Sequence, residues 1–130
     1  MSHRICILGY SLLVAISALG LSPLILADTW DRGAGTGFWS TGTNWADNTE
    51  PTSADPVIFP TPIPGGVSTV TLSSGEQAQS ITFNDNYALS SGNVQLFGAD
   101  GSISVASGRT ATITSSIVGS VGLLKSGSGT

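Results

Sequence analysis

One pattern decides the fold of this chain: Ile81-Thr82-Phe83, Val94-Gln95-Leu96 and Ile103-Ser104-Val105 each place two apolar residues two positions apart. The complete set of such pairs is Val70/Leu72, Ile81/Phe83, Tyr87/Leu89, Val94/Leu96, Ile103/Val105, Ala111/Ile113 and Val121/Leu123. Successive side chains of a strand point to opposite faces, so each pair marks one buried face of a short strand. Turn signals such as Ser73-Ser74-Gly75 separate the pairs, and no window has helical spacing. The pattern predicts an all-β chain.

Two all-β architectures fit strands of this spacing, a β-solenoid and a small β-sandwich. A sandwich is expected to have hairpin loops and longer strands, whereas the strands predicted here are very short. Their outward faces are almost uniformly Ser or Thr. These features favour a right-handed β-solenoid (β-helix) segment over residues 67–130, in which each turn of the chain stacks on the previous one. The small β-sandwich stays the alternative.

Residues 28–66, which precede the alternating region, are rich in aromatic residues and proline. The three tryptophans are Trp30, Trp39 and Trp45. Five prolines follow between Pro51 and Pro64, and because proline lacks a backbone donor they predict an irregular path with one brief strand at Val57-Ile58-Phe59. The end of a solenoid exposes apolar surface and unpaired strand edges. We therefore expect residues 28–66 to form an irregular aromatic and Pro-rich cap.

Residues 1–27 have the organisation of a secretory signal peptide. A short basic region ends at Arg4, an uncharged apolar run extends from Ile5 to Leu21, and the small residue Ala27 precedes Asp28. We predict cleavage before Asp28, followed by a secreted or outer-surface location without membrane insertion. An uncleaved membrane anchor is the alternative, and the glycines and serines within the apolar run disfavour it.

The remaining composition excludes several classes of function. The only histidine and the only cysteine, His3 and Cys6, lie in the predicted signal peptide, so the exported part would have no disulfide and no common nucleophile–base pair. A net charge of −4 with four basic residues argues against a nucleic acid partner. The eight acids form neither a known calcium-binding motif nor a clear hydrolase carboxylate pair. We predict no catalysis, no metal and no cofactor; a polysaccharide-active enzyme fragment is a remote alternative.

The tryptophans are the candidate binding residues. Exposed indole rings stack on sugar rings, so Trp30, Trp39 and Trp45 would suit a small secreted carbohydrate-binding module. In the competing interpretation the same three rings are buried and close the end of the solenoid, because aromatic side chains bury a large area. The second interpretation is favoured, since a solenoid end needs a cover.

The last nine residues read Gly122-Leu123-Leu124-Lys125-Ser126-Gly127-Ser128-Gly129-Thr130. They resemble the opening of the autotransporter-associated β-strand repeat, also called the passenger-associated transport repeat. The positions that match its fixed residues are Gly122, Leu123, Lys125, Gly127, Gly129 and Thr130. The upstream Trp39 and Asn44-Trp45 resemble the leader that precedes such repeats in large bacterial surface proteins. The resemblance implies a bacterial β-helical surface or passenger region, and because the chain stops inside the motif we expect a fragment or a truncated gene product.

Together these features predict a structural role. We expect a non-catalytic exported segment that serves as a scaffold for adhesion or surface display. Its expected partners are further copies of itself or cell-surface glycans.

Overall fold

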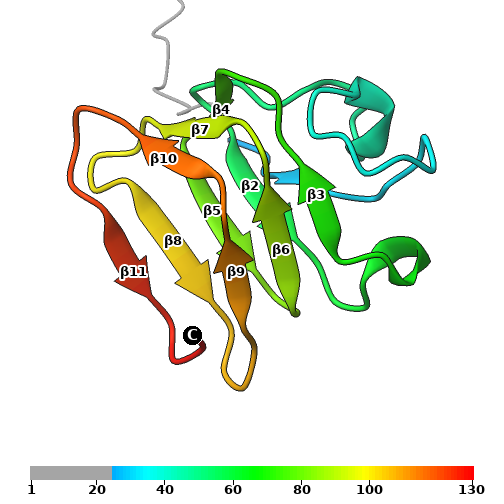
Figure 1. Ribbon diagram of the computed structural model, residues 1–130. Helices are drawn as coiled ribbons and strands as arrows, with labels where there is room; N and C mark the ends of the chain where they lie inside the picture. Colours follow the sequence, from blue (N-terminus) through cyan, green and yellow to red (C-terminus); the bar gives the residue numbers. More distant parts are fainter. Residues whose placement is uncertain (1–24) are drawn as a thin grey trace, which may run out of the picture.

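The computed structural model describes residues 25–130, and over them the chain winds as a β-solenoid of about three turns (Figure 1). The strands are β1 Asp28–Thr29, β2 Pro56–Phe59, β3 Thr69–Thr71, β4 Glu76–Ala78, β5 Ser80–Phe83, β6 Tyr87–Ser90, β7 Asn93–Leu96, β8 Ser102–Val105, β9 Ala111–Ile113, β10 Ser116–Val118 and β11 Leu124–Ser126. Two single-turn 3-10 helices, η1 Gly42–Asn44 and η2 Pro64–Gly66, are the only helices of this described part. The predicted signal peptide lies outside the described residues except for its last three.

Each turn of the chain contributes one strand to each of three sheets. The sheet orders are β1-β2-β5-β8-β11, β3-β6-β9 and β4-β7-β10, and every pairing between these strands is parallel. Parallel strands require crossover connections, and the crossover here runs through the other two sheets. The all-β solenoid is therefore confirmed. The β-sandwich alternative is wrong, because a sandwich is built from antiparallel sheets.

The parallel register places core-facing apolar residues of one turn beside core-facing apolar residues of the next. Ile81 pairs with Ile103, and Phe83 pairs with Val105, each 22 residues further along the chain. The predicted pairs in β3, β5, β6, β7 and β8 all face the core, and their members are at most 5% exposed. Ala111 and Ile113 in β9 are half-buried. The predicted brief strand at residues 57–59 is confirmed as β2.

The last turn differs from the sequence prediction. Val121 and Leu123 are 38% and 59% exposed and lie in the loop before β11, so the prediction that they form one buried strand face is wrong. The strands of this turn are β10, where Ile117 alone is half-buried, and β11. Strand β4 was also missed, because Glu76-Gln77-Ala78 has no large apolar residue, although Glu76 and Ala78 both face the core.

A column of aromatic rings fills the first turns of the solenoid. Trp30, Trp39 and Trp45 are fully buried, and their ring centroids lie 5.8–6.0 Å from that of Phe59. Phe59 in turn stacks on Phe83 with a centroid distance of 5.0 Å and an interplanar angle of 9°. Trp45 also donates a hydrogen bond of 2.8 Å from Nε1 to the carbonyl of Trp39. The tryptophans of residues 28–66 therefore close the interior at the N-terminal end.

Backbone from residues 28–66 also covers the sheet edges at this end. The amide of Trp39 donates to the carbonyl of Thr71 in β3, and the amide of Thr71 donates to Gly37. The buried side chain of Asn44 holds this loop through hydrogen bonds with Ala34, Thr36 and Phe38. Residues 28–66 are not separate from the solenoid, because β1 and β2 continue its largest sheet.

We expect Phe59→Ala to destabilise the fold by about 3–5 kcal/mol, because it leaves a cavity where the tryptophans meet Phe83. Thr82→Ala, whose side chain lies between Ile81 and Phe83 and faces outward, is the matched control and should change the free energy of unfolding by less than about 0.5 kcal/mol. Urea unfolding followed by circular dichroism measures both. Equal effects of the two substitutions would contradict the central role of this ring.

Candidate functional site at the open end

The C-terminal end of the solenoid is uncovered within residues 25–130. Strands β9, β10 and β11 are the outermost members of their three sheets, each with a neighbour on one side only. Figure 1 shows these strands, coloured from orange to red, in the last turn of the solenoid. The start of β9 has one backbone hydrogen bond to the last residue of the chain, in which the amide of Ala111 donates to the carbonyl of Thr130 at 2.7 Å. The unpaired edges of β10 and β11 are the kind of surface that accepts another strand.

The interior of the last turn is open as well. An apolar cavity of about 200 Å³ lies there. Its lining residues are Ile103, Val105, Ala111, Ile113, Ile117, Leu123, Lys125 and Thr130. In the turns above, the equivalent positions are occupied by the next layer of side chains. The open end therefore combines an apolar floor with free strand edges.

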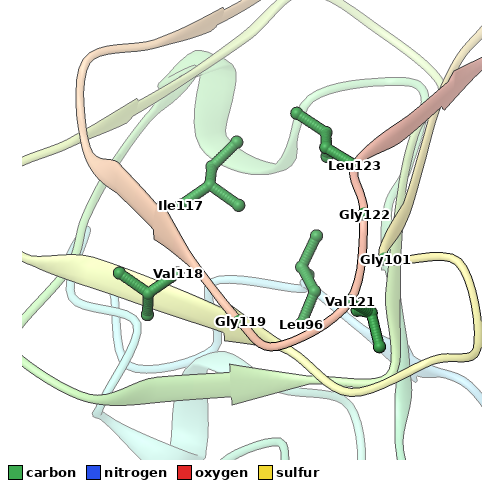
Figure 2. Close-up of a pocket in the computed structure, with 8 residues that line it drawn as sticks. All are labelled: Leu96, Gly101, Ile117, Val118, Gly119, Val121, Gly122 and Leu123. Atoms are coloured by element: carbon green, nitrogen blue, oxygen red, sulfur yellow. The ribbon is translucent and has the colours of Figure 1, made fainter.

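A second cavity of about 130 Å³ lies beside β10 and the loop that leads to β11. Figure 2 shows Leu96, Ile117 and Leu123 around this space, with the glycines 119 and 122 in the loop that borders it. Leu123 and Leu124 are 59% and 48% exposed. Ile117 was missed by the sequence analysis, because it is the only core-facing residue of a three-residue strand and so forms no pair.

Lys125 occupies a core-facing position at this end. It pairs with Ile103 in the parallel register, directly below the ladder of Val57 and Ile81. Its ammonium group folds back over the segment directly after β11 and donates to the carbonyls of Ser126, Gly127 and Gly129. The aliphatic part of the side chain thus covers apolar surface while the charge is satisfied by backbone oxygens. Lys125 limits the open cavity on one side without closing it.

The glycines of the C-terminal motif allow close contact between successive turns. A Cβ atom on Gly127 would lie 2.2 Å from the carbonyl oxygen of Val105, and one on Gly129 would lie 2.2 Å from that of Ala106. The amide of Gly129 donates to Val105 at 3.1 Å. The hydroxyl groups of Thr130 and Thr110 lie 3.1 Å apart. Gly127, Gly129 and Thr130 thus join the last turn to the one above it, whereas the ammonium group of Lys125 bonds within its own turn. Gly122 and Leu123 border the second cavity.

The three candidate sugar-binding tryptophans offer no binding surface. Trp30, Trp39 and Trp45 are each 0% exposed. Trp30 and Trp39 both pack edge to face against Trp45, at centroid distances of 5.1 and 4.9 Å. Sugar stacking requires an open ring face, and the aromatic column occupies these faces. The alternative of a carbohydrate-binding patch built on exposed Trp30, Trp39 and Trp45 is therefore wrong. The structure brings the three residues together as a plug.

The acidic residue of the turn at Asn84-Asp85-Asn86 has structural partners. Asp85 forms an ion pair with Arg109 at 2.9 Å and accepts hydrogen bonds from the amide of Asn86 and the hydroxyl of Thr61. The pKa of Asp85 is lowered chiefly by the hydrogen bond from Asn86, and further by the hydrogen bond from Thr61 and the positive charge of Arg109. In the part of the chain that the structure describes, no group of three or more His, Cys, Asp or Glu residues is arranged to hold a metal ion.

Comparisons with known proteins add no assignment: no family model, no curated protein and no solved structure matches this chain. Among residues 25–130, no helix has the length and apolar character needed to cross a membrane.

We expect Gly127→Ala to destabilise the fold by more than about 2 kcal/mol, whereas Gly108→Ala should cost only about 1–2 kcal/mol. Both glycines have a left-handed backbone, with φ of +71° and +70°, so the cost of this conformation is the same. Only at Gly127 does the added Cβ meet a backbone atom, while nothing lies within 4 Å at Gly108. Urea unfolding measures the difference, and equal losses would show that the contact between turns contributes little.

Proposed function

We propose that this chain is a non-catalytic, exported scaffold segment that forms the closed N-terminal end of a β-solenoid for surface display or adhesion. One observation carries the proposal. The two ends of the solenoid differ, because residues 28–66 cover one end while the other presents an apolar cavity and free strand edges. A solenoid closed at one end is suited to extension or association in a single direction.

The outward surface of the sheets supports a structural role. Most residues that face outward in the strands are polar, such as Thr82, Ser104 and Thr112, and they carry no charge. The exceptions include Ile58 in β2 and, at the open end, Val118 and Leu124. Such a surface stays hydrated without forming a concentrated binding patch. The proposed relation to the autotransporter-associated repeat rests on the motif at residues 122–130, in which Gly127 and Gly129 make the contacts between turns described above.

The structure is compatible with cleavage at the predicted position. The first strand begins at Asp28, directly after Ala27, so cleavage there would leave every strand of the described residues 25–130 in the product. By contrast, Ile25 and Leu26 are 56% and 81% exposed. Removal of residues 1–27 would therefore also remove two apolar side chains that lie outside the core.

Export is tested by the N-terminal sequence and intact mass of the protein recovered from the producing cells. We expect the N-terminal residue to be Asp28, whatever the total length of the product. For the 130-residue chain, the mass would then be below the 13.1 kDa of the complete sequence. A mature protein that retains residues 1–27 would contradict the export proposal.

The partner that we propose for the open end is a second strand edge of the same kind, supplied by another copy. An arriving edge would satisfy the free backbone groups of β10 and β11, and its apolar residues would fill the cavity beside Ile113 and Ile117. No group with an exposed aromatic plane or a clustered charge is needed for such an association.

We expect the 130-residue chain to associate with increasing concentration, and Ile113→Lys to weaken this association at least about tenfold, because it places a charge in the apolar cavity. Thr112→Lys is the matched control, since it adds the same charge to the same strand on the outward face. Sedimentation velocity measures both variants, with circular dichroism as the check that they fold. A wild-type monomer at all concentrations, or equal behaviour of the two variants, would contradict association through the open end.

A further inference from the structure

Lys125 stands at the end of the row of core-facing residues along the largest sheet. The two positions before it in register, Ile81 and Ile103, are apolar and at most 5% exposed. Lys125 follows Ile103, so its side chain takes the core-facing position of β11 and lines the apolar cavity of the open end. It is also the only lysine of the sequence. A basic residue therefore occupies a position that is apolar in the preceding turns.

The other two strand edges at the open end differ from β11 in charge. Strands β9 and β10 contain no charged residue. The residues of these strands that pack against the core are Ala111 and Ile113 in β9 and Ile117 in β10. An inward-pointing charge on an edge strand opposes the addition of a further strand, whereas an uncharged edge accepts it. Of the three edges, β11 alone has such a charge.

The ammonium group of Lys125 is satisfied within its own segment. Its Nζ donates to three carbonyl oxygens, those of Ser126 at 3.3 Å, Gly127 at 3.0 Å and Gly129. An ammonium group has three donors, so these contacts use all of them. The only ion pair among residues 25–130 joins Arg109 to Asp85, so no acid of this part of the chain neutralises Lys125. The charge thus stays beside the cavity without the help of a partner.

The backbone of Lys125 forms the free part of the β11 edge. The amide of Leu124 donates to the carbonyl of Asp100 in the preceding turn at 3.1 Å. Backbone groups of successive strand residues point to opposite neighbours, so the amide and carbonyl of Lys125 point to the unpaired side. Since Lys125 is the central residue of a three-residue strand, any strand that adds to β11 pairs with it. The added strand also brings its own core-facing residue close to the ammonium group.

A second copy of β11 is an unfavourable partner for this edge. Two such strands that pair antiparallel around their centres place one Lys125 side chain directly opposite the other, and like charges in this position are destabilising. An apolar residue from another edge would remove water from the ammonium group, which is costly as well. The charge therefore penalises both kinds of pairing that another copy could offer.

We propose that Lys125 is a gatekeeper of the open end, an inward-pointing charge that opposes the addition of a second copy through β11. The inference rests on the proposed function, because it concerns the edges through which we propose that copies associate. The charge acts at one of the three edges, so it weakens association without abolishing it. Removal of this charge should turn weak association into tight association.

The test compares Lys125→Met with Lys125→Arg in the 130-residue chain. Methionine keeps an unbranched side chain without the charge, whereas arginine keeps the charge. Ser126→Met is the matched control, because it adds the same apolar group at the neighbouring position, on the opposite face of β11. Sedimentation velocity over a range of concentrations gives the dissociation constants, and circular dichroism checks folding. Lys125→Met removes a positive charge from a chain of net charge −4, so general repulsion between copies acts against the expected result.

We expect Lys125→Met to associate at least about tenfold more tightly than the wild type, and Lys125→Arg to show much less of this gain. Ser126→Met should stay within about threefold of the wild type, because its added group faces away from the cavity. Ile113→Lys combined with Lys125→Met should cancel the gain, which would locate the association at the open end.

Chemical modification tests the same charge in the unaltered chain. Lys125 is exposed and, apart from the N-terminal amine, is the only amine of the sequence. Acetylation removes the charge of a lysine, whereas methylation keeps it. We expect acetylation of the folded wild type to tighten association and reductive methylation to do so much less. Acetylation of Lys125→Arg, in which only the N-terminal amine reacts, should not tighten it.

The outcomes separate the gatekeeper role from the proposed function. If the wild type associates and Ile113→Lys weakens it, but Lys125→Met and acetylation leave the dissociation constant unchanged, the gatekeeper role is wrong and association through the open end stands. If Lys125→Met associates while the wild type stays monomeric at all concentrations, the gatekeeper role holds and association of the unaltered chain is refuted. If neither associates, both are wrong.

Discussion

The constraint on which this structure depends is that a solenoid buries its interior along its length and leaves it open at both ends. Along the length, the parallel register repeats the same burial in every turn, as Ile81 on Ile103 and Phe83 on Val105 illustrate. At the N-terminal end the interior is closed by Trp30, Trp39 and Trp45 above Phe59. These rings supply in one layer the apolar contacts that a further turn would make.

The largest sheet shows how polar residues mark the two ends of one ladder. Its core-facing positions follow in register as Asp28, Val57, Ile81, Ile103 and Lys125. A charged side chain in the middle of this ladder would be costly, because it would be buried without water. The two ionisable residues at the ends are accommodated in different ways. Asp28 is buried and its pKa is raised, whereas the ammonium group of Lys125 donates to backbone carbonyls of residues 126–129.

The sequence allowed the solenoid to be predicted wherever two apolar residues shared one strand face, as in Ile81-Thr82-Phe83. It did not allow prediction of β4, β10 and β11, whose core-facing positions hold Glu76, a single Ile117 and Lys125. A periodic apolar pattern fails at the ends of a solenoid, since polar residues replace apolar ones there. Burial of the tryptophans followed from the need for a cap, whereas the burial of Glu76 in β4 had no apolar signal in the sequence.

The same physical reasoning applies to the strand edges at the closed end. Both ends of a parallel solenoid carry strand edges, and an edge that is held only by side chains is easier to uncover than one held by a backbone ladder. The β3 edge has backbone hydrogen bonds with Gly37 and Trp39, whereas within the described residues no backbone hydrogen bond joins residues 47–54 to β4. Glu50 and Pro51 instead line a cavity beside Gly75 and Gln77, so the edge of β4 is the part of the closed end that a backbone ladder does not cover.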